Sequence, residues 1–139
     1  MRLLTKLMRY GWAAPTSLLG LLMATILLIT GGRATRVQGV LEVSGGWLAN
    51  RITHLSGFAA LTLGHVVLGH SADCLQHLRL HEHVHVRQAE RWGIFFVPAY
   101  VLAALWQILR GRHAYRDHPF EQEAFAAESA QCSKDAHSS

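Results

Sequence analysis

The stretch Arg79-Leu-His-Glu-His-Val-His-Val-Arg-Gln88 concentrates three histidines and a glutamate within ten residues. Two of its three histidines, His81 and His85, lie four residues apart, hence on one face of an α-helix, where each can offer a ring nitrogen to one metal ion. Glu82 lies about 100° further round the helix, beside that face, where it can take a proton from metal-bound water. The pattern predicts a metal site with an adjacent base, and His83 is expected to be solvated or to support the ligands.

Helix signals surround this stretch. Ser71-Ala-Asp73 provides capping side chains, and Gly93 stops a helix expected over about residues 74–92. The chain contains ten histidines, so the alternative interpretation is a histidine-rich polar helix face that binds metal weakly or not at all.

A third ligand is expected downstream. A catalytic zinc site takes three protein ligands and leaves a position for water. Glu121 and Glu123 follow Pro119, which favours the first position of a helix. Glu121 is preferred, because Ala124 on the same face allows a close approach to the histidine helix, and Glu123 is the alternative. Both side chains otherwise suit a solvated first turn, where the helix dipole favours acidic residues.

The N-terminal segment predicts a membrane anchor over residues 1–32. Residues 12–30 carry no charge, and as a helix they would span about 28 Å of a roughly 30 Å hydrocarbon core. Three basic residues precede this run and two follow it. This slight excess on the N-terminal side favours a single pass with the rest of the chain on the outer or periplasmic side. The alternative is a cleaved secretory signal with its core at 18–29, although Thr30-Gly31-Gly32 matches a cleavage site poorly.

Two short apolar regions between the anchor and the helix predict β-structure. Residues 36–44 have the β-branched content of one strand. Residues 57–69 form two apolar runs around Gly64-His65, either a hairpin or a bulged strand. The segment Leu61, Thr62 and Leu63 is expected at the sheet edge nearest the metal site, where an extended substrate can add as a strand.

The second apolar run, over residues 93–109, is marginal in length for a membrane span. If both runs crossed the bilayer, Glu121 would lie on the opposite side from His81 and His85, and the site could not form. We therefore expect residues 93–109 to form a buried or membrane-hugging helix.

The charge and hydrophobic content of the chain indicate which kinds of partner to expect. The net charge is +4 and half the residues are hydrophobic, but the basic residues are scattered and form no patch with interleaved aromatic residues. Membrane lipid is therefore an expected partner and nucleic acid is not. No disulfide is expected between Cys74 and Cys132, because residues 129–139 read as a disordered tail.

The order of motifs resembles a known class. His81-Glu82-x-x-His85, an apolar helix and Glu121-x-x-Ala124 together resemble gluzincin-type zinc metallopeptidases. The segments Ala60-Leu-Thr62-Leu-Gly64 and His85-Val-Arg-Gln88 are similar to the uncharacterised peptidase-like domains associated with extracellular contractile injection systems. Phe125 departs from that subgroup, which has an aspartate at this position.

This resemblance implies an α+β fold, with the anchor followed by a small zincin-like domain over residues 33–128. His81, His85 and Glu121 would hold one Zn²⁺ per chain. Glu82 would be the base that activates water for the hydrolysis of a peptide or protein substrate. Tyr115, His113 or His118 is expected to donate to the oxyanion. Two alternatives remain open at this stage. One is a catalytically inactive zinc-binding or membrane scaffold module of the same fold, and the other a histidine-rich metal-handling membrane protein that uses further histidines: His54, His65, His70 or His77.

Overall fold

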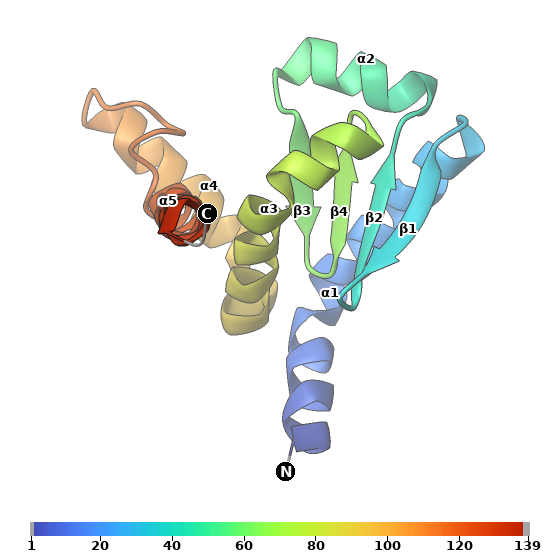
Figure 1. Cartoon of the computed structure of the whole chain (residues 1–139), viewed down its shortest axis with the longest axis horizontal. Helices are drawn as coiled ribbons and strands as arrows, with labels where there is room; N and C mark the ends of the chain where they lie inside the picture. Colours follow the sequence, from blue (N-terminus) through green and yellow to red (C-terminus); the bar gives the residue numbers. More distant parts are fainter. Residues whose placement is uncertain (1, 138–139) are drawn as a thin grey trace.

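A four-stranded sheet lies between helix α1 on one face and helix α3 on the other (Figure 1). The structure, a computed structural model, describes residues 2–137. In chain order its elements are α1 (Arg2–Ile29), β1 (Arg33–Val37), β2 (Val40–Ser44), α2 (Gly46–Ser56), β3 (Ala60–Leu63), β4 (Val66–Gly69), α3 (Ala72–Trp92), the 3₁₀ turn η1 (Gly93–Phe95), α4 (Phe96–Leu109) and α5 (Pro119–His137). The expected α+β class is confirmed.

The sheet consists of two hairpins joined side by side, with the strand order β1-β2-β4-β3. β1 and β2 are antiparallel, β3 and β4 are antiparallel, and β2 runs parallel to β4. The prediction of one strand over residues 36–44 is wrong, because the chain turns at Gln38 and Gly39. Both have positive φ, 51° and 84°, as a two-residue hairpin turn that follows the twist of its strands requires. The hairpin alternative at Gly64-His65 is confirmed.

Helix α1 contributes one side of the hydrophobic core. Ala24 and Leu27 are buried together with strand residues of the α1-facing side of the sheet. Gly20 contacts the β3–β4 hairpin so closely that a Cβ there would lie 2.8 Å from both the Leu63 carbonyl oxygen and the Val66 Cβ. The predicted anchor is therefore integrated into the domain. The opposite face of α1 remains exposed and apolar, at Leu18, Leu19, Leu21, Leu22, Ile26, Leu28 and Ile29.

Helix α3 carries residues 79–88, with His81 and His85, on the other face of the sheet. The Ser71 hydroxyl caps it by accepting a hydrogen bond from the Cys74 amide at 3.2 Å, and Gly93, with φ 58°, ends it. Both predicted boundary signals are confirmed. Val86 and Leu75 pack against Val40 and Val67, so the sheet fixes the rotation of α3.

The C-terminal helix is longer than expected. Residues 129–139 were expected to be disordered, but residues 129–137 continue α5. Exposed side chains bond within the helix there, for example Ser133 Oγ to the Ser129 carbonyl at 3.0 Å and Gln131 Nε2 to Asp135 at 2.9 Å. Residues 138 and 139 lie outside the described residues. Cys74 and Cys132 are free.

Two helical stretches are long and apolar enough to cross a membrane: Leu3–Ile29 and the nearly continuous run Ala72–Leu109. The second is interrupted by η1, and α4 alone would span only about 21 Å. α5 then packs against α3, so the segment after α4 reaches His81 and His85.

Candidate metal centre

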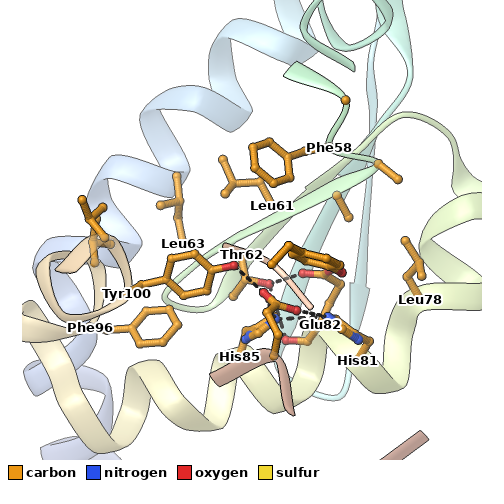
Figure 2. Close-up of a pocket in the computed structure, with 17 residues that line it drawn as sticks. Phe58, Leu61, Thr62, Leu63, Leu78, His81, Glu82, His85, Phe96 and Tyr100 are labelled. Carbon is orange, nitrogen blue, oxygen red and sulfur yellow. Dashed lines mark hydrogen bonds and ion pairs between the residues drawn. The ribbon is translucent and has the colours of Figure 1, made fainter. Parts of the chain in front are cut away.

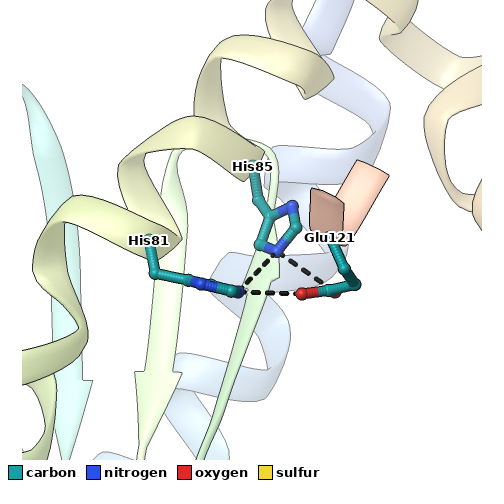
Figure 3. Close-up of side chains that lie close together, drawn as sticks. All are labelled: His81, His85 and Glu121. Atoms are coloured by element: carbon teal, nitrogen blue, oxygen red, sulfur yellow. Dashed lines mark hydrogen bonds and ion pairs between the residues drawn. The ribbon is translucent and has the colours of Figure 1, made fainter. Parts of the chain in front are cut away.

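Three side chains from two helices converge on one point (Figure 3). His81 and His85 project from the same face of α3, and α5 brings Glu121 against them. His81 Nε2 lies 2.8 Å from Glu121 Oε2, His85 Nε2 lies 3.2 Å from Glu121 Oε1, and the two Nε2 atoms are 3.2 Å apart. The three residues are buried, and their ligand atoms lie within 4.8 Å of one another. The ligands predicted from the sequence are therefore assembled as one group.

A buried glutamine sets the tautomer of His85. Its Nδ1 lies 2.8 Å from Gln88 Oε1. An amide oxygen only accepts, so Nδ1 carries the proton and leaves the Nε2 lone pair free for a metal. Gln88 is itself fixed, because its Nε2 donates to the Phe120 carbonyl at 3.0 Å and to Glu123 at 2.9 Å. One side chain thus links the histidine helix to the glutamate helix.

A second carboxylate supports His81. His81 Nδ1 lies 3.4 Å from Glu128 Oε1. Because a carboxylate oxygen accepts, the proton lies on Nδ1 and the Nε2 lone pair is free for a metal. The Phe125 ring, one turn before Glu128 on α5, lies 5.2 Å from the His81 ring. Glu128 and Phe125 thus both contact His81 from α5.

Glu82 lies beside this group without being part of it. The residue is 6% exposed, and its Oε2 accepts a hydrogen bond of 2.7 Å from the Thr62 hydroxyl on β3. Burial disfavours the charged form of a carboxylate, so a buried carboxylate takes up a proton more readily than an exposed one. Glu82 therefore lies beside the three residues with its carboxylate held by the edge strand, in a place where it can take up a proton.

Glu121 is kept ionised by its neighbours. Its burial alone would raise the pKa of the carboxyl, but hydrogen bonds with His81, His85 and Tyr100 outweigh that effect and lower the pKa below its usual range. The Tyr100 hydroxyl donates to Glu121 Oε1. Two imidazoles and a carboxylate are a donor set that suits zinc, and the residues present fit such an ion.

The group forms the floor of a cavity of about 600 Å³ between β3 and α4 (Figure 2). Residues 57–63 line one side, and Phe96, Val97, Tyr100 and Val101 line the other. Tyr115 also reaches this cavity, and burial together with the Glu121 charge raises its pKa to about 12. Its hydroxyl therefore stays protonated and can donate a hydrogen bond.

The other predicted site residues are placed as follows. Glu123 bonds to Gln88 and Arg91 and is not with the histidines. His118 is fully buried and its Nε2 lies 2.9 Å from the Tyr100 carbonyl oxygen, while the exposed His113 accepts hydrogen bonds from the backbone amides of residues 115 and 116. Neither is among the residues that line the cavity, whereas Tyr115, the third candidate oxyanion donor, is.

His83 is neither solvated nor close to the metal ligands. It is half-buried under the sheet, with its Nε2 3.7 Å from Glu42 Oε1. Glu42 itself forms a double hydrogen bond with Arg79, at 2.8 and 2.9 Å. The expectation that His83 supports the ligands or faces solvent is therefore wrong.

Sequence reasoning missed three contributors: Gln88, Tyr100 and Glu128. A signal existed for Gln88, which follows His85 by three residues and so lies on the same helix face. None existed for Tyr100 or Glu128, because their contacts depend on how α4 and α5 fold back. The search of protein-family models, curated proteins and solved structures found no match to this chain.

Proposed function

We propose that this chain is a membrane-associated zinc peptidase that hydrolyses a peptide bond with metal-activated water. The observation that carries the proposal is the convergence of His81, His85 and Glu121, at 2.8 to 3.2 Å, next to the buried base Glu82. When bound, zinc would lower the pKa of its water towards 7 and polarise the scissile carbonyl.

The protein's own side chains have distinct roles in this proposal. Glu82 removes the proton from the attacking water and passes it to the leaving amine, and Thr62 holds the carboxylate in position. Tyr115 donates to the oxyanion, since its hydroxyl stays protonated at neutral pH and lines the cavity. Gln88 and Glu128 orient the two histidine ligands.

The decisive experiment compares the wild type with Glu82→Gln, which keeps the size of the side chain and removes its basicity. We expect one zinc per chain in both proteins and peptide hydrolysis only in the wild type. Hydrolysis at the wild-type rate by a zinc-loaded Glu82→Gln protein would reject the mechanism. Zinc in both proteins with no cleavage of any peptide in a library would favour an inactive metal-binding or scaffold module.

A histidine-rich metal-handling protein has less support. Within residues 2–137, the candidate ligand group is the one formed by His81, His85 and Glu121. His65 instead bonds to Ser17, at 3.3 Å from its Nδ1, and to Glu90, at 3.0 Å from its Nε2. Elemental analysis that finds more than one metal per chain would revive this alternative.

We further infer that α1 is the single helix that crosses the membrane, that α4 contacts the membrane without crossing it, and that the metal centre lies on the outer or periplasmic side. The charge-free run in α1 and the apolar face that it exposes support this inference. Single cysteines placed at the exposed positions 50 and 130, after replacement of Cys74 and Cys132, should be labelled from the same side of the membrane. Labelling from opposite sides would reject the topology.

A further inference from the structure

We propose that the cavity binds an extended apolar segment of a membrane protein, which pairs with β3 as an added strand and reaches the cavity from the lipid phase. This inference rests on the proposed peptidase function and specifies its substrate class. Three features carry it: the backbone groups at the free edge of β3, the side chains that line the cavity, and the surface around its entrance.

The outer edge of β3 has backbone groups free to pair. In the antiparallel pair with β4, Leu61 lies opposite Leu68 and Leu63 opposite Val66, and the His70 amide donates to the Ala59 carbonyl. Residues of an antiparallel strand alternate in the direction of their hydrogen bonds. The odd-numbered residues of β3 therefore bond to β4, and Ala60 and Thr62 direct their N–H and C=O groups towards the open side.

The walls of the cavity are apolar above a polar floor. Phe58 and Leu61 lie on the β3 side, and Val97 and Val101 lie on the α4 side. Among the described residues that line the cavity, the acidic ones are Glu82 and Glu121, and no lysine or arginine is present. Side chains on either side of the reacting bond would therefore be buried against hydrocarbon, which favours apolar residues in the occupant.

The entrance belongs to a larger exposed apolar surface. Leu61 and Val101 are each 50% exposed, and Phe58 is 57% exposed. Further exposed apolar residues follow on η1 and α4: Ile94, Phe95, Leu102, Leu105, Trp106, Ile108 and Leu109. Many exposed apolar side chains on neighbouring elements are costly in water and indicate a contact with membrane or partner. The entrance therefore opens towards lipid, and an apolar segment can enter without first crossing water.

A lipid acyl chain fits these features less well than a peptide does. An acyl chain satisfies the apolar walls but offers no hydrogen-bonding partner to the backbone of Ala60 and Thr62. Leaving such groups unpaired in an apolar site costs free energy, whereas an added peptide strand pairs them. The edge strand thus selects a peptide among apolar occupants.

The test measures binding to the full-length Glu82→Gln protein, loaded with zinc in phospholipid nanodiscs. The probe is a fluorescent membrane-inserted peptide with a Val- and Leu-rich extended stretch. The comparison peptide has Ser and Asn in that stretch. We expect the apolar peptide to bind at least about tenfold more tightly, as burial of one or two apolar side chains gives. Equal affinities would overturn the proposal.

Two further arms test the place and the manner of binding. Val101→Trp should weaken binding of the apolar peptide about tenfold by filling the entrance. Leu105→Trp is the matched control, because Leu105 is also 50% exposed on α4 but does not line the cavity. N-methylation of the peptide backbone should abolish pairing with β3. Unchanged binding of the N-methylated peptide would mean that the cavity takes apolar chains, lipid included, without strand pairing, and would overturn the proposal.

Cleavage by the zinc-loaded wild type separates this inference from the proposed function. Tight binding of the apolar peptide without its hydrolysis supports the binding inference and rejects the peptidase. Hydrolysis of the polar peptide as fast as the apolar one supports the peptidase and rejects the substrate class.

Discussion

The two outer strands of the sheet differ in almost every respect. β1 exposes a row of residues that includes Arg33 and Arg36, whereas β3 carries no charge and lies over Glu82 and the candidate metal centre. Charged side chains on an edge strand discourage other chains from pairing with it. One edge is therefore protected from added strands, and the other is left open beside His81, His85 and Glu121.

The largest effect, loss of zinc and of activity, is expected from removing Glu121 on the β3 side of the molecule. Glu121→Ala deletes the only carboxylate of the ligand group, so we expect loss of stoichiometric zinc and of all hydrolysis. Elemental analysis of the purified protein measures the zinc content. Glu123→Ala is the control, since Glu123 bonds to Gln88 and Arg91 instead, and it should retain one zinc per chain. Equal zinc content in both variants would contradict the assignment.

The next effect comes from giving β3 the character of β1. Leu61→Arg puts a charge at the cavity entrance, and we expect peptide cleavage to fall about 100-fold, because a guanidinium buried against an apolar substrate loses its hydration. Zinc content should not change, since Leu61 does not touch the ligands. Steady-state cleavage with metal analysis on the same sample measures both, and full activity would show that the entrance is elsewhere.

A smaller effect, on metal affinity, is expected from changing Gln88, which contacts His85. Gln88→Leu removes the acceptor that fixes the His85 tautomer, and such changes typically lower metal affinity about 10- to 100-fold. Competition with a chelator of known affinity measures it. Gln76→Leu, an exposed position on the same helix, should leave the affinity unchanged. If both variants bind zinc with equal affinity, Gln88 joins the two helices without affecting the metal affinity of His85.

The acid dependence of the metal-free protein gives a fourth prediction. Because the folded-state pKa of Glu121 lies below its unfolded value, its contribution to stability is present above that unfolded value, about 4.3, and is lost as the pH falls through the folded pKa. Glu121→Gln should therefore lose less stability than the wild type between pH 6 and pH 3, as chemical unfolding can measure. Parallel losses in both proteins would contradict the predicted shift.

The smallest effect is expected at β1. Arg36→Leu should change the free energy of unfolding by no more than about 0.5 kcal/mol, because the side chain is exposed. It should nevertheless increase concentration-dependent self-association by making this edge more like β3. Sedimentation in detergent measures the association. An unchanged monomer would mean that the arginines do not protect this edge.

Local patterns predicted those parts of the molecule that depend on residues near one another in sequence. The cap at Ser71, the stop at Gly93 and the shared face of His81 and His85 follow from helix geometry, and Glu121 followed from a helix signal at Pro119. The roles of Thr62, Tyr100 and Glu128 depend on how distant elements pack, which periodicity does not encode. The turn at Gln38-Gly39 was missed because the apolar residues on both sides of it resembled one strand.

The packing of α1 has a consequence for how the protein is made. Synthesis completes α1 before β2, α2 and β4 exist, although these elements supply the partners of Ala24 and Leu27. During that interval the inward face of α1 needs another apolar environment, and a bilayer or a chaperone provides one. Cleavage near residue 30 followed by loss of α1 would uncover the face of the sheet on which Val43, Val66 and Leu68 are buried.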